Sequence, residues 1–260
     1  MARNTYGLDL GSYEIKVYDK KQDTIWKEKN VLAVQDKKEI IAIGEDAYQM
    51  YEKTPPDIEV AFPMRDGVIS RFNDMQNLLQ NILKKNRHFS RGAEYVIAVP
   101  TDVTEVQKKA FFDLVIHSNA KAREVNIVER SIADAVGLGI DVQNTTGVMI
   151  INFGGETTEL SVLTEGGIVF NRLLKLGGTT LDQEIVNLVR NSHDFLIGSR
   201  TAEILRQQFD VFNGDSETAF SVAGRDLITG LPMRKTISIT LVRAAFKDTL
   251  LECMKAVRSM

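Results

Sequence analysis

Two stretches of the chain repeat one pattern: GLDLGSYEIKVY, which begins at Gly7, and IINFGGETTELSVL, which begins at Ile150. Each has a short apolar strand, a polar residue two positions before a glycine, a turn with hydroxyl side chains, and a second strand of alternating character. This order predicts a β-hairpin in both places. A glycine turn lets backbone N–H groups approach a ligand closely, and such groups suit phosphate oxygens. The repeat therefore predicts two related halves with a phosphate-binding clamp.

The two copies differ in charge. The first has an acid, Asp9, where the second has an amide, Asn152, and the second turn contains the carboxylate of Glu156. An amide brings no negative charge to this position. If Glu156 faces inward, it repels phosphates by about 3 kcal/mol at an effective dielectric constant of roughly 20. These differences predict that the second half of the clamp holds phosphate less firmly than the first.

Length and composition exclude several classes of protein. With 260 residues, 43% of them apolar, the chain is expected to form two lobes rather than one small core. Lys and Arg total 32 against 35 Asp and Glu, so no polycationic surface for nucleic acid is expected. Cys253 is single and the three histidines are scattered, which predicts no metal cluster. The lack of a signal peptide and of an apolar run of about 18 residues favours a cytoplasmic chain.

Strands and helices alternate between the two hairpins. The short apolar runs NVLAVQ and EIIAIG, followed by a helical stretch from Gly44, predict a small subdomain inserted at about residues 30–64. The run EYVIAVP is typical of a strand buried on both faces of a sheet. Alternation of this kind predicts an α/β fold with a mostly parallel sheet flanked by helices. The other elements predicted here are a helix over 72–85, a helix capped within 101–104, a strand from Val125 and a helix over 131–138.

The second hairpin opens a similar series. The turn Gly177–Gly178 is followed by Thr179 or Thr180 as the cap of a helix from Leu181. A helix over 201–209, two strands and a final helix over 241–257 follow. Because a full second lobe needs more strands, we expect an incomplete one. The predicted lobes are residues 1–135 and residues 136–260, the second with a subdomain inserted at about 182–236 and truncated at its C-terminal end.

The basic segment KKNRHFSRG, which begins at Lys84, places Phe89 among four cations. Such a segment can touch an anionic membrane. We interpret it as a solvated loop, because one aromatic side chain buries little apolar surface.

The chain contains the phrases DLGSYEIKVY, EKTPPDIEVAFPMRDGVI, YVIAVPTDVTEVQKKAFFD, ERSIADAVGLG, FGGETTELSVL, LGGTTLDQEI, IGSRTAEIL and VAGRDLITGLP. In this order they resemble the actin-like ATPase superfamily, and within it the MreB/Mbl family of bacterial actins. The resemblance implies an actin-like (ribonuclease H-like) fold of duplicated lobes, each a mixed sheet with flanking helices and an inserted subdomain. It implies ATP or ADP with magnesium between the hairpins. It also implies filaments of the chain or a paralogue at the inner membrane face, with cell-wall synthesis proteins as partners.

The resemblance also implies roles for individual residues. Asp9 matches an acid that acts near the metal through water, and Asn152 stands where the family has a second acid. Arg130 occupies the place of the family's water-orienting glutamate, and Glu129 precedes it. The positions that match the family's nucleotide-binding residues are Gly11, Ser12, Tyr13, Glu14, Gly154, Gly155, Glu156, Thr157, Gly177, Gly178, Ser199, Arg200, Thr201, Ala202, Glu203 and Arg206.

These matches suggest a degenerate member of the family. Arg130 cannot accept a proton at physiological pH, so it cannot act as a base. We hypothesise a cell-shape protein of MreB type that binds ATP weakly or without hydrolysis, a pseudo-ATPase whose filaments guide cell-wall synthesis. Two alternatives stay open. In a fully active ATPase, Glu129 takes the catalytic place and Glu156 turns outward, and in a non-polymerising adaptor the same fold serves division or pilus assembly.

Overall fold

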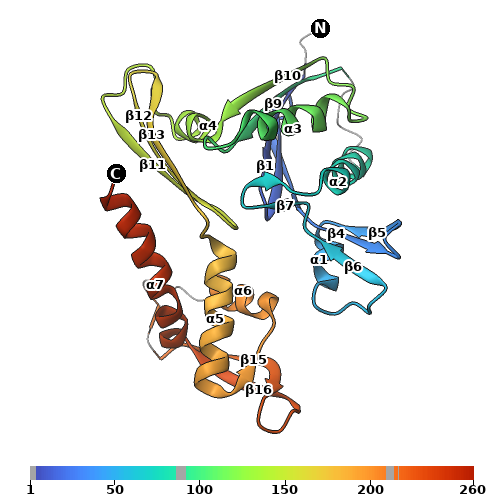
Figure 1. Cartoon of the computed structure of the whole chain (residues 1–260), viewed down its shortest axis with the longest axis vertical. Coiled ribbons are helices and arrows are strands. Elements are labelled where there is room, and N and C mark those ends of the chain that lie inside the picture. Colours follow the sequence, from blue (N-terminus) through green and yellow to red (C-terminus); the bar gives the residue numbers. More distant parts are fainter. Residues whose placement is uncertain (1–3, 86–91, 209–213, 216) are drawn as a thin grey trace. The chain divides into compact units, whose positions relative to one another are not determined.

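The computed structural model describes residues 4–85, 92–208, 214–215 and 217–260. Residues 86–91, which hold most of the basic segment around Phe89, lie outside the described residues. The chain divides into two compact units, Met1–Lys175 and Leu176–Met260 (Figure 1). The predicted lobes, with their boundary at residues 135 and 136, stay a prediction.

The first unit is built on a five-stranded mixed sheet in the order β10-β9-β1-β2-β3. β1 (Thr5–Leu10) pairs in parallel with β9 (Glu94–Val99), which pairs in parallel with β10 (Glu124–Glu129). β2 (Glu14–Asp19) and β3 (Thr24–Lys29) extend the sheet in antiparallel fashion from β1. The mixed sheet that the family resemblance implies is therefore confirmed. The expectation of a mostly parallel sheet was wrong, because the hairpin strands β2 and β3 join the sheet themselves and make two of its four pairings antiparallel.

Three helices accompany this sheet. α2 (Phe72–Lys85) begins and ends where the hydrophobic periodicity predicts. α3 (Glu105–Ile116) begins after Thr104, whose side chain forms a capping box with Gln107. α4 (Arg130–Gly137) follows β10 without an intervening loop. The predicted helices are therefore present within a residue or two of the expected ends.

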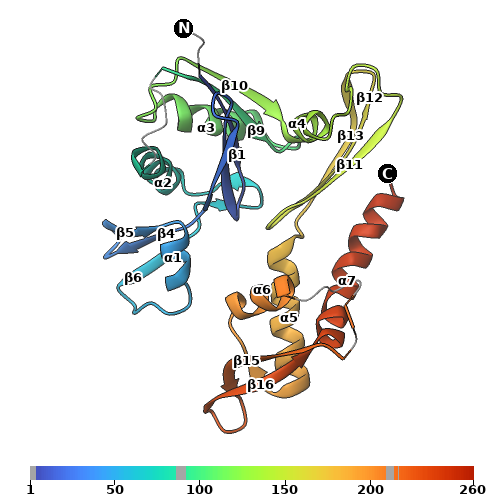
Figure 2. The same ribbon diagram turned by 180° about the vertical axis from the view of Figure 1, so that it is seen from behind.

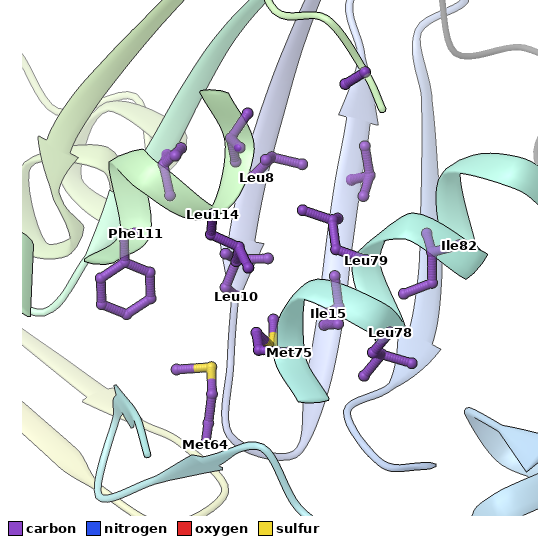
Figure 3. Close-up of a cluster of buried hydrophobic side chains, with 14 of the residues drawn as sticks. Leu8, Leu10, Ile15, Met64, Met75, Leu78, Leu79, Ile82, Phe111 and Leu114 are labelled. Atoms are coloured by element: carbon purple, nitrogen blue, oxygen red, sulfur yellow. The ribbon is translucent and has the colours of Figure 1, made fainter. Parts of the chain in front are cut away.

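The core of the first unit lies between the sheet and α2 and α3. Apolar side chains from β1 and β2 meet those of both helices in one buried cluster, which Figure 3 shows. Trp26 on β3, the only tryptophan of the chain, packs half-buried against the same cluster. Fully or almost fully buried members include Leu8, Leu10, Ile15, Met64, Met75, Leu78, Leu79, Ile82, Phe111 and Leu114.

β9 is buried on one face only. Tyr95 and Ile97 point into the core, whereas Val96 and Ala98 are partly exposed on the opposite face. The expectation that this strand is buried on both faces was wrong. In the described part of the chain, the core that contains α2 and α3 covers one face, and Val96 and Ala98 line a shallow apolar hollow with Ile25 on the other.

Two smaller groups of strands belong to the first unit. β4 (Leu32–Gln35), β5 (Glu39–Ile43) and β6 (Ile58–Ala61) form a sheet in the order β5-β4-β6, with α1 (Glu45–Met50) packed against it. β7 (Met64–Arg65) and β8 (Val68–Ile69) are joined by a two-residue turn, Asp66–Gly67. Both turn residues have positive φ, 53° and 81°, which is why an Asp-Gly pair suits this turn.

A second three-stranded meander repeats the arrangement of β1, β2 and β3. β11 (Val148–Phe153), β12 (Thr158–Thr164) and β13 (Gly167–Leu174) pair in sequence order, all antiparallel. The last pair before each hairpin turn, Leu10 with Ile15 and Phe153 with Thr158, leaves four residues in both turns. Both hairpins predicted from the sequence are therefore present.

The second unit packs helices on a small antiparallel sheet in the order β14-β15-β16, and α5 contacts both α6 and α7 (Figure 2). Gly177, rather than Thr179 or Thr180, is the N-cap of α5, and the Thr180 hydroxyl accepts a hydrogen bond from the Gly177 N–H at 3.1 Å. None of the helices in the described ranges is long and apolar enough to span a membrane. The elements are α5 (Gly178–His193), β14 (Phe195–Leu196), α6 (Ser199–Gln208), β15 (Ala219–Asp226), β16 (Pro232–Ser238) and α7 (Ile239–Arg258).

The turn after β15 is organised by the buried side chain of Asp226. Its Oδ1 accepts hydrogen bonds from the Thr229 N–H at 2.8 Å and from the Ile228 N–H at 3.1 Å. Its Oδ2 lies 3.0 Å from the Lys235 ammonium. The Thr229 N–H, the Lys235 ammonium and the Thr229 hydroxyl together lower the pKa of Asp226 to about 2.

We expect Asp226→Asn to lower the free energy of unfolding at pH 7. Because the folded pKa lies below the unfolded value of about 3.9, the carboxylate stabilises the fold above that value and this contribution is lost as pH falls towards 2. The variant should therefore show a shallower loss of stability between about pH 4 and pH 2. Urea unfolding at a series of pH values measures this. Asp248→Asn, at an exposed position of α7, is the control, and an equal response of both variants would contradict the prediction.

Candidate functional site

The two hairpin turns have the same local geometry. The Gly11 N–H donates to the Glu14 carbonyl oxygen at 3.1 Å, and the Gly154 N–H donates to the Thr157 carbonyl oxygen at 2.8 Å. A Cβ atom at Gly11 would lie 2.7 Å from the Glu14 oxygen, and one at Gly154 would lie 2.9 Å from the Thr157 oxygen. Both positions therefore require glycine for the same reason, close approach of backbone to backbone.

A cavity of about 320 Å³ is lined by both turns, and every lining residue belongs to the first unit. Glu129, which the sequence places beside the catalytic positions, does not line this cavity. It lines a separate groove with Lys108, Phe112 and Ile168. The residues that line the cavity are Asp9, Gly11, Ser12, Tyr13, Glu14, Lys16, Arg130, Asp134, Asn152, Phe153, Gly154, Gly155, Glu156 and Thr157.

Two cations lie beside Asp9. Lys16 faces Asp9 across the β1–β2 ladder, and its Nζ lies 3.0 Å from Asp9 Oδ2. Arg130 Nη2 lies 3.5 Å from Asp9 Oδ1. The carboxylate predicted to act near a metal is therefore already neutralised by two side chains of the protein itself.

Asn152 donates a hydrogen bond from Nδ2 to Asp134 Oδ2 at 2.6 Å. Asp134 lies on α4, four residues after Arg130, so both face the same side of the helix. Burial raises the pKa of Asp134, while the hydrogen bond from Asn152 and the charge of Arg130 oppose the rise. The Asn152 amide therefore binds the carboxylate of Asp134, a residue that the sequence pattern did not indicate.

Arg130 is the first residue of α4, and its side chain is only 12% exposed. Its Nε and Nη2 atoms are buried and have no hydrogen-bond acceptor among the described residues. Buried N–H groups of this kind are costly unless an acceptor is supplied. The guanidinium lines the cavity, so an oxyanion bound there is a suitable acceptor.

The β7–β8 turn connects the two glycine turns. The Asp66 N–H donates to Glu156 Oε2 at 2.8 Å, and the Gly67 N–H donates to Ser12 Oγ at 3.2 Å. The Glu156 carboxylate therefore has a hydrogen-bond donor of its own while it lines the cavity. This hydrogen bond holds the Glu156 carboxylate. It therefore reduces the repulsion expected between an inward Glu156 and phosphates.

Tyr13 fills the space between the turns. A Cβ atom at Gly155 would lie 2.6 Å from the Tyr13 Cβ, so the two turns touch here. The Lys29 ammonium lies 3.6 Å from the centre of the Tyr13 ring and contacts its hydroxyl. Buried Asn30 fixes the first turn, because its Nδ2 donates to the Gly11 carbonyl at 2.8 Å and its N–H donates to the Tyr13 carbonyl at 3.0 Å.

The remaining predicted positions belong to the second unit. Gly177 and Gly178 lie at the start of α5, and the run from Ser199 to Arg206 lies on α6. Arg206 forms a bidentate pair with Asp182 on α5, at 2.7 and 3.2 Å. Ala202 and Glu203 are buried on the same helix, and burial raises the pKa of Glu203. Their role toward adenosine stays a prediction.

Pattern reading missed four residues: Lys16, Asp134 and Phe153, which line the cavity, and Asn30, which holds the first turn. Lys16 had a signal, since a hairpin with a four-residue turn pairs position 9 with position 16. Asp134 also had one, because it follows Arg130 at the helical spacing of four. Asn30 had none, since it reaches the first turn only through the folded chain.

The donor set fits a phosphate better than a divalent metal. Glycine turns, a lysine and an arginine supply N–H groups and positive charge to an oxyanion. Magnesium prefers carboxylate and water oxygens, whereas Asp9 here has two cationic neighbours and Asn152 replaces an acid. Within the described ranges, no group of three or more His, Cys, Asp or Glu residues is placed to hold a metal.

Duplicated meanders with equivalent glycine turns, set against a mixed sheet with packed helices, define an actin-like protein. The chain belongs to the MreB/Mbl family, since the family model described as MreB/Mbl protein matches residues 3–260. It is 33% identical over 266 residues to the cell shape-determining protein MreB of Escherichia coli K12, covering 99% of this chain and 76% of that protein. It is 29% identical over 259 residues to the cell shape-determining protein Mbl of Bacillus subtilis, covering 98% of this chain and 77% of that protein.

Solved structures agree with the family and the fold. MreB5 of Spiroplasma citri bound to AMPPNP matches with a TM-score of 0.90 and 30% identity, covering 100% of this chain and 78% of that one. The MamK double helical filament matches with a TM-score of 0.78 and 20% identity, covering 99% of this chain and 79% of that one. The second likeness concerns the fold alone. The predicted actin-like fold and family resemblance are both confirmed.

Proposed function

We propose that this chain is a cytoskeletal subunit of MreB type, which binds a nucleotide and associates with copies of itself or of a paralogue in filaments that contribute to cell shape. Family membership supports the cytoskeletal role, because the curated relatives are named for determining cell shape. Solved relatives bound to AMPPNP and to ADP support nucleotide binding. Self-association in filaments is proposed from the family resemblance.

We also propose that hydrolysis is weak or absent. The observation that carries this proposal is Arg130, a largely buried cation that lines the cavity, and the resemblance matches it to the water-orienting glutamate of the family. A guanidinium cannot accept a proton from water. Glu129, the nearest carboxylate in sequence, lines a different groove. The proposed site therefore binds phosphate without the group that would activate a water molecule.

By family resemblance, the filaments act in the cytoplasm at the inner face of the cell membrane, with cell-wall synthesis proteins as partners. This placement is a proposal that rests on the resemblance alone. Co-sedimentation of the purified chain with anionic lipid vesicles tests the membrane part, and a chain that stays in the supernatant under all nucleotide conditions contradicts it.

Phosphate release and sedimentation test the central proposal. We expect the purified chain to bind ATP, to sediment as filaments and to release phosphate far more slowly than Escherichia coli MreB measured in parallel. Steady turnover that Asp9→Ala abolishes would contradict the loss of hydrolysis. Nucleotide binding without sedimentation at any protein concentration would favour a non-polymerising adaptor instead.

A further inference from the structure

The carboxylate closest to a metal position is already paired. Asp9 lies 3.0 Å from the Lys16 ammonium and 3.5 Å from the Arg130 guanidinium. A divalent cation coordinated there would lie close to two positive charges, which repel it. The register of the β1–β2 ladder holds Lys16 opposite Asp9, so this arrangement is a property of the fold.

Position 152, where the resemblance implies a second acid, also differs from the family. Asn152 has no charge, and its amide nitrogen donates to Asp134 at 2.6 Å. An uncharged amide oxygen is a weaker partner for a divalent ion and its waters than the carboxylate of an acid would be. The two changes act in the same direction, because each lowers the affinity of the cavity for a divalent ion.

Arg130 supplies the positive charge toward phosphate that a metal ion otherwise provides. Its Nε and Nη2 atoms make no hydrogen bond within the described residues, although Nη2 lies 3.5 Å from Asp9 Oδ1, and its side chain is largely buried at the cavity wall. A guanidinium binds phosphate oxygens through two parallel N–H groups. Lys16, whose half-exposed side chain pairs with Asp9, adds a second positive charge to the lining of the same cavity.

We propose that Arg130 and Lys16 take the place of the divalent cation, so that the phosphates of the nucleotide are held without magnesium. This inference rests on the nucleotide binding proposed above. Phosphate binding by fixed side chains leaves the charge of the site unchanged when the metal concentration changes. The nucleotide then binds as a ligand whose affinity does not depend on the metal.

Calorimetric titration of the full chain with ATP, once with excess EDTA and once with magnesium chloride, tests the inference. We expect the two dissociation constants to differ by less than about ten-fold, because no divalent ion takes part in binding. Binding that appears only with magnesium overturns the inference and leaves the proposed nucleotide binding intact. A lack of binding in both conditions overturns both proposals.

Substitutions at Arg130 test whether this side chain binds the phosphates. We expect Arg130→Gln to weaken metal-free ATP binding by about ten- to a hundred-fold, because a charge-assisted pair to phosphate is lost. Arg130→Lys keeps the charge but not the planar fork, so it should retain part of the affinity. Arg123→Gln, at an exposed position before β10, is the matched control and should bind as the unmodified chain does. Unchanged affinity of a folded Arg130→Gln would contradict the assigned role of Arg130.

Discussion

Replacing Phe111 by Ala is expected to lower the free energy of unfolding of the first unit by about 3–5 kcal/mol. Phe111 is fully buried on α3, within the cluster that joins this helix to β1 and α2. The substitution removes the ring and leaves a cavity that the surrounding side chains fill only in part. Since whole domains are stable by about 5–15 kcal/mol, this loss is large.

Phe112→Ala is the matched control, because it removes the same side chain from the next position of α3. The Phe112 side chain is 36% exposed at the edge of the groove that also contains Glu129. Thermal unfolding followed by circular dichroism measures both variants. A fall of roughly 10 °C in Tm for Phe111→Ala and a much smaller change for Phe112→Ala are expected. Equal falls would show that α3 does not pack as described.

Replacing Gly224 by Ala is expected to destabilise the second unit by about 2–3 kcal/mol or more. An added Cβ would lie 2.5 Å from the Leu196 carbonyl oxygen and 2.6 Å from the Phe195 ring. The carbonyl belongs to β14, which pairs with β15 at this point, so it cannot retreat without disturbing the sheet. Phe195 is fully buried in the core of the second unit and has no space to move.

Gly137→Ala is the corresponding control, with the opposite expected sign. Gly137 ends α4, and no atom lies within 4 Å of an added Cβ. Alanine reduces the freedom of the unfolded chain, so we expect a gain of a few tenths to about 1 kcal/mol. Differential scanning calorimetry measures both variants. A loss of stability at Gly137 that matches the loss at Gly224 would contradict the packing described for these two positions.

Local sequence patterns were sufficient to predict the two hairpins and helix α2. The two hairpins follow from a polar residue, a glycine turn and alternating strands, and the structure confirms both. The α2 helix follows from hydrophobic periodicity alone. These features depend on neighbours in sequence, for which residue types carry direct information. For the same reason, Asp9 and Asn152 were recognised as equivalent before their positions were known.

Long-range contacts account for what pattern reading did not provide. The Asp66 N–H reaches Glu156 across 90 residues of sequence, so the orientation of that carboxylate is decided by a distant turn. Asn30 stabilises the first turn in the same manner. The burial of β9 also depends on which elements cover the sheet, because an apolar sequence does not specify whether one face or both are packed.

The position of Trp26 offers a spectroscopic consequence. It is the only tryptophan of the chain, and it lies half-buried on β3 in the first unit. Its emission therefore follows the unfolding of that unit, whereas far-ultraviolet ellipticity follows helices in both units. Coincident curves from the two signals indicate one cooperative transition, and separated curves indicate that the units unfold independently. The single tryptophan is therefore an optical probe of the first unit alone.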